Sequence, residues 1–140
     1  MSLKGLSVVS EVERLEVFRL AETAGLKDIV VEVGNKLAGD WLSVSRFREV
    51  QQLAARLLKV HTGPFTLVLA GRAWDSTGDG EAALVYYEQA LPLTRATGDR
   101  AGEAATLSNI GAVHAARGDG EVALAFYEQA LPLLQSTGDR

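Results

Sequence analysis

The fold is decided by two stretches of the sequence, GDGEAALVYYEQALPLTRATGDR at residues 78–100 and GDGEVALAFYEQALPLLQSTGDR at residues 118–140. Six of the 23 aligned positions differ, so 17 are identical, at a constant spacing of 40 residues. Chance does not produce such agreement between two parts of one chain, and it indicates tandem copies of a single structural unit. The chain is therefore expected to be built from repeated units.

Each copy has the spacing of an amphipathic helix. Leu84, Tyr87 and Leu91 recur at three- and four-residue steps, which places an apolar stripe along one face of a helix. Gly78 suits the left-handed conformation that closes a preceding helix, and Asp79 suits the cap of the next one. The Gly-Asp pair returns every twenty residues, so each unit is predicted to be two helices joined by tight turns. The further pairs are Gly98-Asp99, Gly118-Asp119 and Gly138-Asp139.

The first helix of each unit varies more than the second. Thr66, Leu67 and Gly71 match residues 40 positions later, whereas residues 72–77 differ throughout from residues 112–117. Positions that pack against a neighbouring unit are constrained in every copy of a repeat, and positions that face a ligand are free to differ. The uneven similarity therefore indicates that a binding groove lies along the first helices.

These units resemble tetratricopeptide repeats. That family places a small residue where its two helices cross, an aromatic residue three positions later, and an Ala-aromatic-Ala pattern along the second helix. Glycine and alanine let the backbones approach closely, and a large ring from the other helix fills the remaining space. The residues predicted to pack the repeats are Gly71, Trp74, Ala83, Tyr87 and Ala90 in one unit and Gly111, His114, Ala123, Tyr127 and Ala130 in the next.

The resemblance implies an all-α fold, a right-handed α-solenoid of antiparallel helix pairs with about seven helices. The period of 40 residues resembles the long-helix variety found in kinesin light chains and bacterial signalling proteins. Pro92 and Pro132 depart from the family pattern because they fall inside the second helix, where each removes one hydrogen bond and should bend the helix.

The N-terminal part has a weaker form of the same pattern. We expect one domain over residues 1–140, made of an N-terminal helix (8–25), a diverged repeat (26–62), a repeat (63–99) and a last repeat (100–140). In the diverged repeat Trp41 takes the aromatic slot, and Val50 and Leu57 take the small slots of the second helix. The stretch WLSVSRFREVQQLAARLL at residues 41–58 is similar to the segment that opens the repeat array of bacterial STAND-class regulators. We expect one of two arrangements. Either this array is a fragment of a longer one, or its open C-terminal face packs against another copy.

The composition excludes several functions. The chain has no cysteine, which excludes disulfides, thiolate nucleophiles and zinc-thiolate sites and fits a reducing cytoplasm. A net charge of −4 without a basic run makes a poor binder of nucleic acid or of a membrane surface. No apolar run approaches the ~18–20 residues of a membrane span. We expect a cytoplasmic protein with no nucleic-acid partner and no membrane partner.

The sequence offers little for catalysis or for binding a cofactor. His61 falls at a predicted helix end, where the helix dipole favours a cation, and His114 falls in a packing slot. The Gly78-Asp79-Gly80 run lacks the Lys-Ser/Thr of a phosphate loop and the spaced carboxylates of a calcium loop. The chain is therefore predicted not to be an enzyme, with no catalytic residue, no cofactor and no metal.

In the tetratricopeptide family the first helices line a concave groove. When the groove positions of that family are transferred to this sequence, they give a candidate peptide groove. Asn109 in this groove could hold a peptide backbone, because a side-chain amide both donates and accepts hydrogen bonds. Leu69 stands at the equivalent position of the preceding unit, so the asparagine is not repeated. Arg72 and Arg117 would favour an acidic or C-terminal carboxylate ligand. The candidate groove consists of Val68, Arg72, Asp75, Ser76, Ser108, Asn109, Ala112, Ala115 and Ala116.

We therefore predict a protein–protein or protein–peptide interaction module, the scaffold or sensor arm of a larger bacterial signalling protein. Two alternatives stay open. One is a structural module that self-associates through its open C-terminal repeat face, since an exposed face of buried character is sticky. The other is a sensor of a small molecule or a signalling peptide that uses the same groove.

Overall fold

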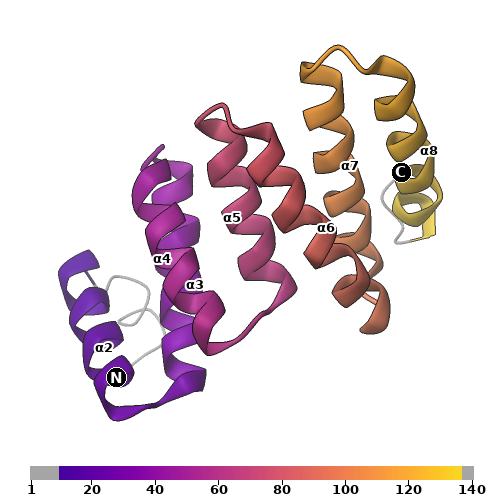
Figure 1. Cartoon of the computed structure of the whole chain (residues 1–140). Coiled ribbons are helices and arrows are strands. Elements are labelled where there is room, and N and C mark those ends of the chain that lie inside the picture. The colour runs from indigo at the N-terminus through magenta and orange to yellow at the C-terminus, as the bar shows by residue number, and fades with distance from the viewer. Residues whose placement is uncertain (1–9, 137–140) are drawn as a thin grey trace.

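The computed structural model describes residues 10–136, which form helices joined by short turns and contain no strand. Consecutive helices run antiparallel and stand side by side in a single row from the N-terminal to the C-terminal end (Figure 1). This arrangement confirms the predicted all-α solenoid. The seven helices within residues 10–136 are α2 (Glu11–Ala24), α3 (Lys27–Ser43), α4 (Phe47–Val60), α5 (Pro64–Ser76), α6 (Gly80–Ala96), α7 (Arg100–Ala116) and α8 (Gly120–Ser136).

The turns between helices have the predicted chemistry. Gly78 adopts a left-handed φ of +90° after α5, and the Asp79 carboxylate accepts a hydrogen bond of 3.0 Å from the Ala82 N–H of α6. Asp99 caps α7 in the same way. The side-chain oxygen satisfies one of the free amides of a first helical turn, which is why Asp recurs at these positions. The Gly138-Asp139 pair and the first two residues of the predicted 8–25 helix lie outside the described residues.

Pro92 and Pro132 lie inside helices, as the sequence predicts. Both α6 and α8 continue through their proline over 17 residues each. Proline lacks the N–H that would donate to the carbonyl four residues earlier, so each helix gives up one internal hydrogen bond at this point.

The two helices of a pair pack closely at a glycine of the first helix. A Cβ atom added at Gly71 would lie 2.4 Å from Cε1 of Tyr87, and one added at Gly111 would lie 2.9 Å from Cε1 of Tyr127. Both distances are shorter than real Cβ contacts, so only glycine fits under the ring without a shift. The tyrosine of the second helix therefore fills the space that the glycine of the first helix leaves open.

The α3–α4 pair makes the same kind of contact at a different place. Leu57 of α4 lies over Gly34 of α3, where an added Cβ would come within 2.3 Å of the leucine side chain. The assignment of Leu57 to a small slot is therefore wrong: Leu57 is the large partner of this crossing. Ala54 lies 33 positions before Tyr87, so in the diverged repeat it stands where the later pairs carry the tyrosine ring. Ala54 is fully buried.

Helix α2 contacts the rest of the array through two buried residues and several charged side chains. Only Phe18 and Ala21 are buried, while Arg14 pairs with Asp40 at 2.6 Å. The Glu11 carboxylate accepts hydrogen bonds from Trp41 Nε1 and from Arg46, which lower the pKa of Glu11, the Trp41 bond having the larger effect. Trp41 is thus buried as predicted for an aromatic slot, with its indole N–H used to dock α2.

The core runs along the row of helices rather than around one centre. A first cluster of buried side chains joins α2, α3, α4 and α5, a second joins α6 and α7, and a third joins α7 and α8. Partly buried side chains of α5 pack against the second cluster. Leu91 and Phe126 contact both the second and the third cluster. Each helix pair is therefore stabilised chiefly by the pairs on either side, as expected of a solenoid.

Candidate functional site

The nine residues of the candidate groove lie on two helices that contact each other, α5 and α7. Six of them are exposed, so their side chains are accessible to a partner. Val68, Ser108 and Asn109 are half-buried. The exposed members are Arg72, Asp75, Ser76, Ala112, Ala115 and Ala116.

Asn109 occupies the helix position that, in the copy on α5, is turned toward the preceding helix pair. Its counterpart in α5, Leu69, is buried in the first core cluster, which shows that this helix position faces the preceding pair. Within residues 10–136 the Asn109 amide makes no hydrogen bond to the protein. A half-buried amide without a protein partner can donate to and accept from a bound backbone.

Arg72 and Asp75 are the charged groups of the groove on α5. Both lie near the ring of Tyr87 and act on its ionisation. Burial raises the pKa of the Tyr87 hydroxyl well above its ordinary value, the Asp75 carboxylate raises it further, and the Arg72 guanidinium lowers it. Among the described residues no carboxylate pairs with Arg72, so its guanidinium is available to an anionic group.

Arg117 differs from its predicted role. Its guanidinium lies 3.6 Å from the Glu81 carboxylate at the start of α6. An ion pair between exposed side chains is weak, but it draws Arg117 toward α6 rather than leaving it free over the groove. Arg72 is therefore the cation with which the groove could bind a carboxylate.

The predicted packing residues lie between helices, with one difference between the two units. Ala83, Ala90, Ala123 and Ala130 are buried, and the His114 ring stacks on Phe126 with its centroid 5.6 Å away. Tyr127, expected to be buried like Tyr87, is partly exposed although it contacts Gly111. No described helix follows α8, so nothing in residues 10–136 covers the outer side of its ring.

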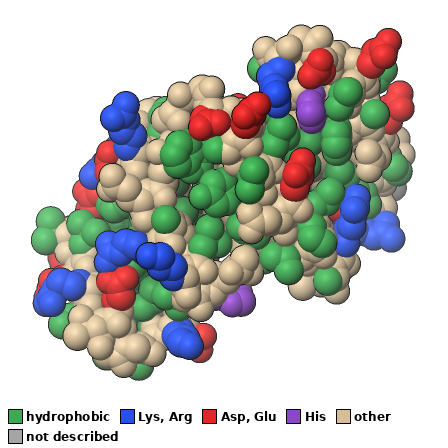
Figure 2. All heavy atoms as spheres, viewed as in Figure 1, with side chains coloured by type: hydrophobic (Ala, Val, Ile, Leu, Met, Phe, Trp, Pro, Cys, Tyr) green, Lys and Arg blue, Asp and Glu red, His purple; other side chains and the backbone are tan. Residues whose placement is uncertain are grey.

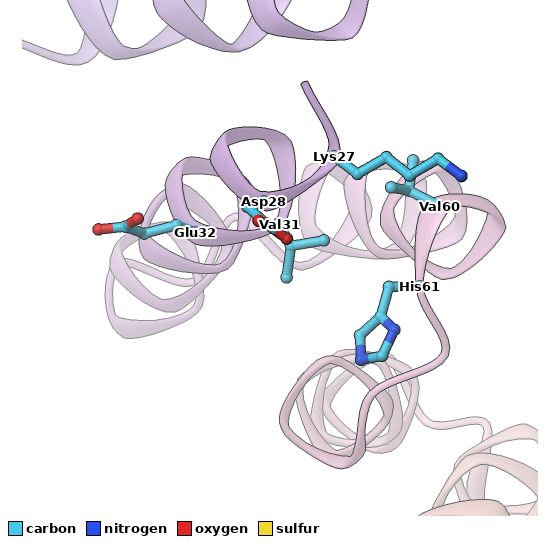
Figure 3. A pocket seen from close by; sticks show the side chains of 6 residues that line it. All are labelled: Lys27, Asp28, Val31, Glu32, Val60 and His61. Atoms are coloured by element: carbon cyan, nitrogen blue, oxygen red, sulfur yellow. The ribbon is translucent and has the colours of Figure 1, made fainter. Parts of the chain in front are cut away.

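The structure also has a hollow that sequence reasoning missed. It measures about 400 Å³ and lies between the first turns of α3 and the connection from α4 to α5. Val31 and His61 face the same space, whereas Glu32 points away from it (Figure 3). No sequence signal joins these two segments, which are about thirty residues apart. The lining residues are Lys27, Asp28, Val31, Glu32, Val60 and His61.

The described residues offer no site for a metal ion. Among them no group of three His, Asp or Glu side chains has the spacing of metal ligands. The buried Nδ1 of His114 has no hydrogen-bond partner, and the nearest carboxylate oxygen, on Asp119, is 3.9 Å away.

None of the described helices is long and apolar enough to pass through a lipid bilayer.

Hydrophobic side chains spread across the middle of the face seen in Figure 2, and the charged side chains stand around them. A partner that contacts this face would meet apolar surface bordered by charges of both signs. Interfaces between proteins commonly have this composition, an apolar centre with a polar rim.

Comparison with known proteins agrees with the repeat architecture. The sequence pattern of the tetratricopeptide repeat family matches residues 76–136, which contain α6, α7 and α8. The crystal structure of MamA is similar over 91% of this chain and 80% of that chain, with a TM-score of 0.65 and 15% sequence identity. At this identity the likeness shows a shared fold and nothing more. No curated protein matches the sequence.

Proposed function

We propose that the chain is a non-enzymatic protein-interaction module, and that it serves as the scaffold or sensor arm of a larger bacterial signalling protein. The tetratricopeptide repeat match and the solenoid fold support an interaction module. The signalling role rests on the resemblance of residues 41–58 to the opening segment of bacterial regulatory arrays.

The partner is proposed to bind as an extended segment along α5 and α7. One observation carries this choice: Asn109 and Arg72, on two helices that contact each other, lack protein partners among the described residues, and most of the other candidate groove residues are Ala or Ser. An amide that holds a peptide backbone and a guanidinium that holds a carboxylate would together favour an acidic or C-terminal segment.

The experiment is an affinity capture from a bacterial lysate, quantified by mass spectrometry, with the wild type and two groove variants, Asn109→Ala and Arg72→Glu. Arg100→Glu is the matched control, because Arg100 is an exposed arginine at the start of α7, outside the groove. We expect at least one protein to be recovered by the wild type and the control but depleted at least tenfold with Arg72→Glu. Equal recovery of every protein by all four chains would remove the groove proposal.

A second candidate function is self-association through the C-terminal end of the array. The observation that favours it is the exposed apolar surface of α8, where Leu124 and Leu131 are mostly accessible. Light scattering over a hundredfold range of protein concentration would test it. A molar mass that rises with concentration supports self-association, and a strict monomer counts against it.

A further inference from the structure

A second hollow lies where the first turns of α4 meet the end of α5. It measures about 380 Å³, which is room for a small organic ligand, and we name it the α4–α5 hollow. Trp74 of this hollow follows Arg72 of the candidate groove by two residues, which places them roughly 200° apart around the helix, so the two sites lie on different sides of α5. The lining residues are Arg48, Gln51, Gln52, Trp74, Thr77 and Asp79.

The next junction of the array shows what fills this place elsewhere. Thr77 stands where the following unit carries Arg117, whose longer side chain lies 3.6 Å from Glu81. At the α4–α5 junction Gln51 reaches across instead. Its amide nitrogen donates to the Ala73 carbonyl at 3.3 Å and to the Thr77 hydroxyl at 3.0 Å. The amide N–H groups of Gln51 are therefore used within the protein, and the shorter Thr77 leaves the space beside them open.

Arg48 brings a charge of the opposite sign to this junction. By the 33-residue spacing that aligns Ala54 with Tyr87, Arg48 stands in the place of Glu81. Glu81 has a cation opposite it, whereas the residue opposite Arg48, Thr77, carries no charge. Across residues 10–136 no carboxylate pairs with Arg48, which is exposed. The α4–α5 hollow thus has a guanidinium without an anion.

Two further side chains of the hollow can donate hydrogen bonds. The indole N–H of the half-buried Trp74 has no acceptor in the part of the chain that the structure describes, and the amide of Gln52 makes no hydrogen bond there either. Asp79 contributes a carboxylate, but this group accepts from the Ala82 N–H at the start of α6. The positive end of the α6 dipole offsets its charge. A bound group would therefore meet mainly N–H donors.

We propose that the α4–α5 hollow binds a carboxylate, either of a small organic acid or of an acidic peptide side chain. Arg48 is the counter-ion, and Trp74 and Gln52 supply further hydrogen bonds. The planar guanidinium matches a carboxylate because the two groups form a pair of parallel hydrogen bonds. The site does not depend on the candidate groove, whose cation is Arg72.

The experiment follows the two tryptophan indole N–H signals of the isotope-labelled chain by NMR while a ligand is added. Trp41 is an internal control, because its indole N–H already donates to Glu11, and Trp74→Phe assigns the signals. Glutarate represents the small acid, and a glycine–glutamate–glycine peptide with both ends capped represents the acidic side chain. Their uncharged controls are glutaramide and the glutamine form of the peptide.

We expect at least one of the charged ligands to shift the Trp74 signal saturably, with a Kd below about 10 mM, which suits ligands of so few atoms. The Trp41 signal should stay in place. Which of the two charged ligands binds more tightly distinguishes the small acid from the peptide side chain as the source of the carboxylate.

The test variant is Arg48→Glu, which restores the charge of the next junction and should weaken binding at least tenfold. Arg48→Gln, which removes the charge without reversing it, should also weaken binding. Arg72→Glu is the matched control and should bind like the wild type, because it changes an exposed arginine of the groove.

Four results would overturn the proposal. The first is a Trp74 signal that neither charged ligand shifts saturably. The second is an equal shift with the uncharged controls, and the third is equal binding by the wild type and both Arg48 variants. The fourth is an equal response to inorganic phosphate, which would mean that the hollow attracts any anion. An unchanged Trp41 signal in the Arg48 variants shows that the fold is intact, so that a loss of binding is assigned to the missing guanidinium.

Discussion

Helices α6 and α8 are two copies of one helix in different surroundings. Six of their 17 aligned residues differ, so 11 are identical, and the apolar residues at Leu84, Tyr87 and Leu91 recur in α8 as Leu124, Tyr127 and Leu131. In α6 these positions lie under α7, and in α8 no described helix covers them. The comparison teaches that burial in a repeat array is decided by the neighbouring pair and not by the sequence of the helix itself.

The largest expected difference between the copies is the effect of removing the tyrosine ring. Tyr87→Ala should lower the free energy of unfolding by about 3–5 kcal/mol, because it empties a closed space between α5, α6 and α7. Tyr127→Ala should cost roughly half as much, since water already reaches one side of its ring. Urea unfolding of the two variants measures both values. Equal costs would mean that α8 is covered as fully as α6.

A smaller difference is expected at the glycines beneath the rings. In Gly71→Ala the new methyl group would meet the fixed ring of Tyr87, so the variant should lose about 1–2 kcal/mol even after the gain in helix propensity. In Gly111→Ala the ring of Tyr127 is free to move outward, and the two effects should nearly cancel. Thermal unfolding compares the pair. A larger loss for Gly111→Ala would reverse our account of which ring is held in place.

A third difference, seen only at high pH, concerns the ionisation of Tyr87. Because burial raises its pKa in the folded chain, the neutral phenol contributes fully to stability below the unfolded pKa of about 10. The contribution is lost as the pH rises above that value, by about 1.4 kcal/mol per pH unit. The free energy of unfolding of Tyr87→Phe, relative to that of the wild type, should therefore be higher at pH 11 than at pH 8. Tyr127→Phe is the control, and a similar gain in that variant would contradict a special role for Tyr87.

The repeat itself could be predicted from the sequence because duplication leaves a direct record. Gly78, Asp79 and the apolar stripe of residues 78–100 define turn, cap and buried face by local rules, and all three appear in the structure. Gly71 under Tyr87 follows from the small-large pattern of the same copies. Where the chain repeats itself, one unit predicts the other.

The sequence was less informative where a property depends on distant residues. Leu57 was assigned to a small slot because Gly34, its partner across the α3–α4 crossing, is 23 residues away and has no counterpart in the clear repeats. The ion pair of Arg117 with Glu81 and the hollow beside His61 likewise depend on segments brought together only by folding. The exposure of Tyr127 was missed because the sequence of α8 is nearly that of a covered helix.

The most direct test of the central claim is to supply α8 with the neighbour that α6 has. Residues 137–140 repeat the sequence of residues 97–100, so a copy of residues 101–117 added after Arg140 continues the chain in the register that leads into α7. The control extension carries Asp at the copies of Ile110 and Val113. Hydrogen exchange of the α8 amides is then compared with that of α6.

We predict that the apolar extension slows exchange in α8 to the rate of α6, and that the Asp-bearing extension leaves it unchanged. Exchange in α8 that is equally fast with both extensions would contradict the claim that a covering helix accounts for the difference between the two copies.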